Sequence, residues 1–423
     1  MPRGQRAGKL RGMRHLLLIS CRFPPLAGAG TQRALKLCKA APELGWRVTV
    51  LAATPRPGDR CDETLLQQLP KHVPVVRTPP VPLNFLPRQV DPWLIPDTLV
   101  AWYLMAVRAA RGVLDTDPVD AILSTSPPHT AHLVARTVAT ERQIPWMADL
   151  RDPWTDNRFL HQQPIQNPLE KLRNWLDHQL EAQVYADASL VSVTTAPLAR
   201  LLQQKHGLAQ EKIVLARNGF DESDFAPFPL TPPPRNPEAM LVRFAGSIYA
   251  NYTFEPFLRA MEVLLQRRPQ APIRFECYLN ERALAAELLA RYPQTQARSS
   301  VHPQVPNNQV AALYRGADVL TLSCLDDLST PTKVFEYARA AVPILAFTVP
   351  LAEANEVIAR TQTGLCVPHD QPEVGAMALE TLLDRWENHQ PLANLLPEQV
   401  HGLERRVAYR EMLGRLDLLC QQK

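Results

Sequence analysis

The sequence contains no apolar run of the roughly 18 residues that a membrane-spanning helix needs. The short apolar stretch His15–Ser20 follows a basic start without a small-residue cleavage site, so we expect no secretory signal peptide. The seven cysteines are scattered and form no C-x-x-C pair, which favours a reducing compartment. These absences predict a cytoplasmic protein, and they leave open a peripheral attachment to the inner face of a membrane.

Net charge is also nearly absent from most of the chain. The formal charge is +4, but residues 1–14 hold five basic residues and no acid, so the remainder is close to neutral. A neutral body lacks the clustered basic surface that nucleic-acid binding needs. We expect residues 1–14 to form a disordered basic tail, with contact to anionic lipid as the alternative.

Proline, by contrast, is abundant, with 41 residues against 16 glycines. Two segments concentrate it: residues 70–96 contain eight prolines and residues 227–237 contain six. We interpret residues 70–96 as an excursion near the mouth of a ligand cleft or as the cover of a helix. Residues 227–238 are predicted to connect two domains, because proline removes backbone donors and cannot join a sheet.

Short β-rich runs alternate with helical periods, which is typical of parallel sheets covered by helices. We therefore predict an α/β protein of two doubly wound parallel-sheet domains, residues 15–226 and 239–392, facing a cleft. The predicted strands of the first domain are Leu16–Ser20, Arg47–Ala52, Ala121–Ser124, Trp146–Leu150 and Ser189–Val193. Those of the second are Leu241–Ala245, Ile273–Tyr278, Val319–Ser323, Ile344–Phe347 and Leu365–Val367.

Three polar motifs follow predicted strands of the first domain, where ligands of open α/β sheets gather. In FPPLAGAGTQR, Gly28 and Gly30 allow a tight turn before a helix whose free amides can receive an anion, and a plain turn is the equal alternative. STSPPH places His129 at the start of a helix, and without a carboxylate partner it predicts no metal site. ADLRDPW concentrates Asp149 and Arg151 at a strand end, as ligand groups or as a structural ion pair.

The motif of the second domain is STPTKVFEYARAAVPIL. Lys333 and Glu336 lie three residues apart at the start of a predicted helix, a spacing that places them on one face. Such a pair is usually a surface contact. At a cleft, however, the cation suits a diphosphate and the carboxylate suits paired ribose hydroxyls.

These motifs, in this order and together with ARNGFD, resemble the retaining, nucleotide-sugar-dependent glycosyltransferases of the B-type fold. The similarity spans about residues 15–390 and is greatest to members of bacterial surface-polysaccharide assembly. It implies two Rossmann-like domains, with the donor bound mainly by the second. It also implies a final helix within residues 393–423, with Gln399–Gln421 as the candidate, that crosses back to the first domain.

The resemblance implies roles for individual residues. Glu336 matches the second glutamate of the family's E-x7-E motif and would bind ribose, and Lys333 would meet the diphosphate. Gly28 and Gly30 would lie near the donor phosphates, and Gly246 would form the first turn of the donor domain. The acceptor would face the groups of the first domain, His129, Asp149 and Arg151.

The chain departs from the family at two places. Leu328 stands where the first glutamate is expected, which leaves Asp326 or Asp327 to contact the sugar. The family's Arg–Lys pair after the first strand of the second domain is missing, and Ser247 lies in that stretch instead. Lys333 would then carry more of the diphosphate charge, with Arg33 or Arg151 across the cleft.

The resulting hypothesis is a metal-independent, retaining glycosyltransferase. It would use no cofactor, take a nucleoside diphosphate sugar as donor, and act on a saccharide or lipid-linked acceptor as a monomer or dimer. Two alternatives remain: a nucleotide-sugar epimerase, and a catalytically silent protein that binds a glycan or a partner enzyme. The two missing motifs favour the silent protein, and the apolar residues of 70–96 speak against the epimerase.

Overall fold

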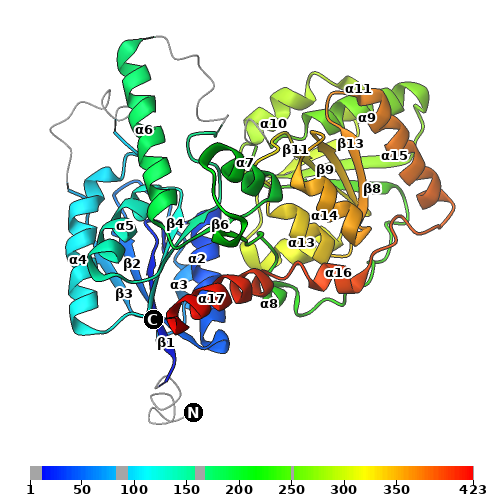
Figure 1. Cartoon of the computed structure of the whole chain (residues 1–423). Coiled ribbons are helices and arrows are strands. Elements are labelled where there is room, and N and C mark those ends of the chain that lie inside the picture. The colour runs from blue at the N-terminus through cyan, green and yellow to red at the C-terminus, as the bar shows by residue number, and fades with distance from the viewer. Residues whose placement is uncertain (1–11, 82–93, 158–166, 249–251, 423) are drawn as a thin grey trace. The chain divides into compact units, whose positions relative to one another are not determined.

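A computed structural model describes residues 12–81, 94–157, 167–248 and 252–422 (Figure 1). The chain forms two compact units: unit 1 comprises residues 1–217 and 406–423, and unit 2 comprises residues 218–405. Each unit is a parallel sheet covered by helices, so the predicted α/β class with two doubly wound domains is confirmed. Residues 1–11 of the predicted tail and 82–93 of the predicted excursion lie outside the described residues.

The sheet of unit 1 has seven parallel strands in the order β3-β2-β1-β4-β5-β6-β7. Its strands are β1 (Arg14–Ile19), β2 (Trp46–Ala53), β3 (Val75–Thr78), β4 (Ala121–Ser126), β5 (Trp146–Leu150), β6 (Leu190–Val193) and β7 (Ile213–Leu215). Its helices are α2 (Ala29–Ala40), α3 (Thr64–Gln68), α4 (Tyr103–Thr116), α5 (Thr130–Arg142), α6 (Pro168–Asp187), α7 (Ala196–His206) and α17 (Arg405–Gln421). Short 3-10 turns are η1 (Ala41–Leu44), η3 (Val100–Trp102) and η4 (Gln210–Lys212).

Both faces of this sheet are buried, which explains why its strands read as continuous apolar runs. Along β1, Leu17 and Ile19 point into a core with residues of α4, α5, α6 and α7. Leu16 and Leu18 point into a second core with residues of α2 and α17. The alternation follows from the period of two in a strand.

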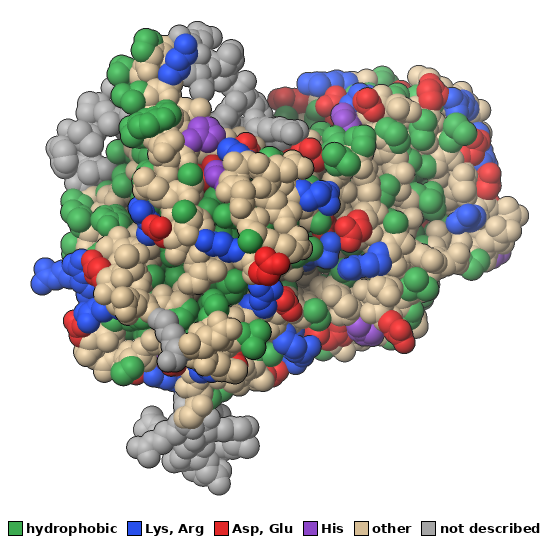
Figure 2. All heavy atoms as spheres, in the orientation of Figure 1, with side chains coloured by type: hydrophobic (Ala, Val, Ile, Leu, Met, Phe, Trp, Pro, Cys, Tyr) green, Lys and Arg blue, Asp and Glu red, His purple; other side chains and the backbone are tan. Residues whose placement is uncertain are grey.

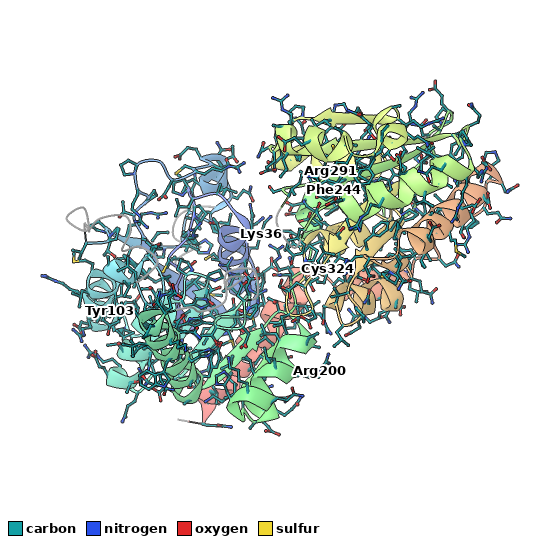
Figure 3. The ribbon with its side chains drawn as sticks, turned by 90° about the horizontal axis from the view of Figure 1, so that it is seen from above. Lys36, Tyr103, Arg200, Phe244, Arg291 and Cys324 are labelled. Carbon is teal, nitrogen blue, oxygen red and sulfur yellow. The ribbon has the colours of Figure 1, made fainter. Side chains whose placement is uncertain are left out.

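Unit 2 repeats the arrangement with six parallel strands in the order β10-β9-β8-β11-β12-β13. Its strands are β8 (Met240–Ala245), β9 (Ile273–Tyr278), β10 (Ser299–His302), β11 (Val319–Cys324), β12 (Ile344–Thr348) and β13 (Gly364–Pro368). Its helices are α8 (Glu222–Phe225), α9 (Glu255–Arg267), α10 (Arg282–Leu289), α11 (Pro293–Gln296), α12 (Val310–Arg315), α13 (Lys333–Arg339), α14 (Glu353–Thr361), α15 (Pro372–Glu387) and α16 (Pro397–His401), with the 3-10 turn η5 (Asn307–Gln309). Figure 3 shows Phe244 of β8 and Cys324 of β11 within this unit.

The end of the chain belongs to unit 1, but it is not one continuous helix as predicted. Helix α16 ends at His401, and α17 begins at Arg405. Within unit 1, Tyr409 of α17 packs in the core beneath α2 and donates its hydroxyl to the carbonyl of Arg33 at 2.8 Å. The chain therefore leaves unit 1 after Arg217 and returns to it at Arg406.

The proline-rich segment 227–237 lies inside unit 2, so its prediction as a connector between the units is corrected. Arg315 donates to the carbonyl oxygens of Pro229 and Thr231 at 3.1 and 3.0 Å. Arg235 donates to the carbonyl of Trp386 at 3.0 Å. Proline cannot donate to a sheet, but these carbonyls still accept hydrogen bonds, and the segment packs on its unit.

Candidate functional site

In each unit the motif residues gather at the carboxyl ends of the central strands. In unit 1 the connections leave β1 and β4 in opposite directions, and in unit 2 they leave β8 and β11 in the same way. Such a reversal opens a crevice at the strand ends, where ligands of open α/β sheets bind.

Helix α13 is held against the end of β8 in unit 2. The buried hydroxyl of Tyr337 lies 3.4 Å from the carbonyl oxygen of Ala245. One turn earlier on the helix, Lys333 crosses Gly246, and a Cβ atom on Gly246 would lie only 2.2 Å from Lys333 Cε. Gly246 also has a φ of +149°, which side chains rarely adopt. Both the backbone and the lysine therefore require glycine at this position.

Lys333 is a cation at this edge, close to the Glu336 carboxylate. It is the only lysine between residues 218 and 405. Within the described parts of the chain, its ammonium forms no hydrogen bond and no ion pair. Burial lowers the pKa of Lys333, and the nearby Glu336 carboxylate opposes that shift. A half-buried cation in this position favours binding of an anion.

Glu336 is oriented by a tyrosine that no local motif predicted. Tyr314 of α12 donates its hydroxyl to Glu336 Oε2 at 2.8 Å. The Tyr314 ring is buried and meets Tyr337 edge to face, with ring centroids 4.8 Å apart. Burial, aided by the Glu336 charge, raises the pKa of Tyr314, so it remains a donor. The carboxylate is thus held through Oε2, and a carboxylate has a second oxygen, Oε1, that can accept further hydrogen bonds.

The loop after β11 separates the two acids predicted to replace the missing glutamate. Asp326 is buried and accepts from the Leu328 backbone N–H at 3.0 Å and from the Ser329 hydroxyl. It therefore stabilises its own turn, and Leu328 is buried beside it. Asp327 remains partly exposed at the edge and stays the candidate for contact with a sugar.

Two hydroxyls near this loop were not found from the sequence. Ser323 Oγ and Thr330 Oγ1 are buried, and neither has a hydrogen-bond partner within the part of the chain that the structure describes. Buried polar atoms are nearly always paired in native proteins, so such orphans indicate a missing partner such as a ligand or water. Clusters of serine and threonine after a strand are the only sequence signal for them.

In unit 1, Arg33 and Asp149 form a buried pair with each other. Arg33 Nε donates to Asp149 Oδ2 at 2.9 Å and Nη2 donates to Oδ1 at 2.8 Å. Thr125 and Ser192 also donate to the Asp149 carboxylate, at 2.9 and 2.8 Å. These bonds and the Arg33 charge outweigh desolvation and lower the pKa of Asp149. Both side chains are therefore engaged in this pair, which positions the strand end, and their predicted substrate contacts stay predictions.

Arg151 is only partly buried, unlike its neighbour Asp149. Its Nε donates to the Ser126 carbonyl at 2.6 Å, and its Nη2 donates to that of Pro127. The guanidinium lies against Gly30 in the first turn of α2, where a Cβ atom would come within 2.0 Å of Nη1. Gly28 caps the same helix with a φ of +125° and no side-chain cap bond. This cation, beside a helix end whose N-cap residue has no side chain to accept from the free backbone N–H groups, can bind an anion.

His129 is a buried, neutral imidazole. Its ring stacks on Trp154, with centroids 4.3 Å apart and planes 10° apart. Burial, reinforced by His132, lowers the pKa of His129 far below its ordinary value. Its Nδ1 is buried without a partner among the described residues. His129 can therefore exchange hydrogen bonds with a ligand but not supply a positive charge.

Among the residues that the structure describes, no cluster of three or more His, Cys, Asp or Glu side chains could hold a metal ion. In the same residues, no helix combines the length and apolar character required to cross a membrane.

Comparison with protein families gives two matches along the chain. Residues 28–219 match the family described as "Glycosyl transferase 4-like domain", and residues 239–385 match "Glycosyl transferases group 1". Together the matches cover most of the 423 residues, one in each unit. A comparison with the sequences of curated proteins finds no match.

Solved structures share the whole architecture. Sucrose-phosphate synthase from Thermosynechococcus elongatus is 16% identical with a TM-score of 0.69, over 97% of this chain and 99% of that one. Anabaena HepE in complex with UDP-glucose is 14% identical with a TM-score of 0.64, over 95% and 99%. WaaG, a glycosyltransferase involved in lipopolysaccharide biosynthesis, is 12% identical with a TM-score of 0.63, over 95% and 99%. At these identities the likeness establishes the fold.

Proposed function

Because the chain belongs to the glycosyltransferases with two Rossmann-like domains, we propose that it moves a sugar from a nucleoside diphosphate sugar to an acceptor hydroxyl. The acceptor is a saccharide or a lipid-linked saccharide, and the pathway is cell-surface polysaccharide biosynthesis. The observation that carries this proposal is the edge of unit 2, where Lys333 lies over Gly246 without a partner in the described residues and Glu336 is held by Tyr314.

The donor binds at this edge in the proposed function. The diphosphate meets the Lys333 ammonium, which the absence of a side chain at Gly246 allows to cross the backbone there, and Ser247 follows next in the chain. Glu336 Oε1 accepts from the ribose hydroxyls, while Asp327 contacts the sugar ring. HepE, which shares the fold, was solved with UDP-glucose, and this supports a uridine nucleotide as the first donor to test.

The reaction needs charge stabilisation on the leaving diphosphate more than it needs an added base. Lys333 is a cation of unit 2 that forms no ion pair among the described residues, and Arg151 beside Gly28 and Gly30 offers another cation at the edge of unit 1. Preorganised cations of this kind stabilise charge as it develops in the transition state. We propose that transfer supported in this way retains the anomeric configuration of the sugar and needs no metal ion. In this proposal, His129 exchanges hydrogen bonds with the substrates.

Nucleotide binding tests the donor site first. UDP, GDP, ADP and CMP are added separately to the wild type and to Glu336→Ala, and the shift in melting temperature is recorded. One nucleotide is expected to stabilise the wild type, and Glu336→Ala is expected to reduce its affinity by roughly 10-fold to 100-fold, as loss of a charged hydrogen bond does. Glu380→Ala, in α15, is the matched control. No shift with any nucleotide would overturn the donor assignment.

Transfer itself is tested with the matching nucleotide sugar. The anomer released on slow hydrolysis, followed by nuclear magnetic resonance, should keep the configuration of the donor, and a chelator should leave the rate unchanged. An inverted anomer contradicts retention, and loss of activity with chelator contradicts metal independence. Interconversion of the sugar at one carbon, without release, would instead identify an epimerase.

A second candidate function is a silent binding protein. The observation that favours it is the buried Leu328 in place of the first glutamate, beside an Asp326 that is committed to its own turn. In that case nucleotide binding persists, but hydrolysis and transfer are both absent. Restoration of activity by Leu328→Glu would show that this single position separates the two functions.

A further inference from the structure

Helix α6 is buried at one end and exposed at the other. Toward its C-terminus, Val184 and Tyr185 lie in the core of unit 1. Toward its N-terminus, four large apolar side chains are exposed: Leu169 by 64%, Leu172 by 52%, Trp175 by 56% and Leu176 by 39%. In Figure 1 this helix stands out from the rest of unit 1, and Figure 2 shows hydrophobic and basic side chains together at its projecting end.

The exposed side chains form one face. With 3.6 residues per turn, Leu169, Leu172, Trp175 and Leu176 fall within an arc of about 120°. Lys171 borders this arc on one side and Arg173 on the other. The buried residues Asp177, Glu181 and Tyr185 occupy the opposite side of the helix. The outer half of α6 is therefore amphipathic, but its apolar face is exposed where that of a surface helix is usually buried. One basic residue lies at each border of this face.

The inward side of α6 anchors this face. Trp154 Nε1 donates to Asp177 Oδ1 at 2.9 Å. Glu181 accepts from the Thr155 backbone N–H at 3.3 Å and from the hydroxyl of the same residue. Lys205 of α7 pairs with Glu181 at 3.3 Å. A helix fixed by these buried bonds can hold its apolar face in place, although these four side chains join no core among the residues that the structure describes.

Topology places the exposed end at the edge of the sheet that carries Arg151. A helix between parallel strands runs back along the sheet, so α6 starts at the carboxyl edge where β5 ends and finishes where β6 begins. The start of β1 at Arg14, from which the basic tail leaves, lies at the opposite edge. The apolar face of α6 and the candidate ligand-binding residues of unit 1 thus both lie toward the edge formed by the carboxyl ends of the strands.

We propose that the outer half of α6 binds unit 1 to the surface of a bilayer that contains anionic lipid. Three leucines and a tryptophan can enter the boundary between headgroups and acyl chains, where tryptophan is favoured. Lys171 and Arg173 then extend to lipid phosphates on both sides. These bordering cations favour an anionic membrane over an apolar protein groove. The proposal rests on α6 alone and does not depend on the transfer reaction.

Vesicle flotation tests the proposal on the full chain. Wild-type protein is mixed with vesicles of phosphatidylcholine alone or with about one third phosphatidylglycerol, and the fraction that floats is measured. The wild type should float with the anionic vesicles and much less with neutral ones. Leu169→Gln/Leu172→Gln should lower partitioning by about tenfold or more, because two buried leucines are lost from the interface. Lys171→Gln/Arg173→Gln should lower it several-fold on anionic vesicles only.

The matched control changes two exposed leucines of unit 2, Leu284→Gln/Leu351→Gln, which should float like the wild type. A second readout uses Trp175: vesicles should shift its emission to the blue, and the shift should disappear in Trp175→Phe, even if the double leucine variant fails to fold. Failure of the wild type to float, or equal floating of all variants, would overturn the proposal. A dimer that dissociates on the leucine changes, without vesicle binding, would identify a second copy as the occupant.

Discussion

Arg33 of α2 and Asp149 of β5 are joined by two hydrogen bonds of 2.9 and 2.8 Å, and both side chains are almost completely buried. The same guanidinium donates to the carbonyl of Ala216 at 3.0 Å, directly after β7. The Arg33 carbonyl accepts from Tyr409 of α17. One ion pair therefore ties together the first helix, two strand ends and the returning C-terminal helix of unit 1.

Breaking this pair should cost stability rather than substrate affinity. Asp149→Asn leaves the Arg33 charge buried without its counter-charge, and it should lower the free energy of unfolding of unit 1 by about 3–5 kcal/mol. Arg33→Met/Asp149→Leu should cost less, because no unpaired charge remains. Urea unfolding can be followed by tryptophan fluorescence, because six of the seven tryptophans lie in unit 1 and the signal therefore reports mainly on that unit. Trp386 is the only tryptophan between residues 218 and 405. Unchanged stability together with a raised KM for the donor or the acceptor would contradict this prediction and would indicate that Asp149 contacts a substrate.

Gly246→Ala should weaken donor binding through Lys333. The new Cβ atom would overlap Lys333 Cε and must displace the lysine, while the φ of +149° adds backbone strain of about 1–3 kcal/mol. Nucleotide affinity, measured by calorimetry, should fall by at least about tenfold. Gly112→Ala is the control, because Gly112 lies within α4 with open space around it and alanine is the better helix former there. Equal nucleotide affinities of the Gly246→Ala and Gly112→Ala variants would show that Lys333 does not contribute to nucleotide binding.

Two acids on α6 should give stability opposite dependences on pH. Burial raises the pKa of Asp177 from 3.8 to about 6, so the folded state holds its proton more tightly, and stability falls as pH rises from about 4 to 6. Burial opposes ionisation of Glu181, but the nearby His206 ring, the hydrogen bonds from Thr155 and the Lys205 charge outweigh it and lower the pKa of Glu181 from 4.5 to about 2. Its contribution is present above pH 4.5 and is lost as pH falls toward 2.

The substitutions follow these signs. At pH 8, Asp177→Asn should stabilise unit 1 by about 1–3 kcal/mol, and the gain should vanish near pH 4. Glu181→Gln should cost about 3 kcal/mol at pH 8 and little near pH 2. Melting temperatures across this pH range measure both effects. Destabilisation by Asp177→Asn at pH 8 would show that the charged carboxylate is favoured by the Trp154 hydrogen bond.

The sequence predicts the central strands well and the edges poorly. Trp146–Leu150 and Ile273–Tyr278 are found with their bounds, because strands buried on both faces are continuous apolar runs. The missed strands β3, β7 and β10 are three or four residues long and lie at sheet edges. An edge strand packs on fewer neighbours, so its composition carries less signal.

The candidate site divides in the same way. Lys333 and Glu336 can be found from the sequence because they lie within one helical turn of each other. The bond from Tyr314 to Glu336 and the pair of Arg33 with Asp149 join residues 22 and 116 positions apart. No local pattern encodes such contacts, since they arise from the packing of separate elements. The prediction that residues 227–238 connect the two domains fails for a related reason. Their proline content excludes a strand, but it does not prevent them from packing on unit 2.

Protection of Lys333 from acetylation tests the donor site most directly, because this is the only lysine between residues 218 and 405. The protein is acetylated with and without the nucleotide that raises its melting temperature, and each lysine is quantified by mass spectrometry. Nucleotide should slow modification of Lys333 by about tenfold or more, with no change at Lys212 of unit 1, the internal control. An unchanged rate at Lys333 under saturating nucleotide would contradict the central claim that this lysine binds the diphosphate.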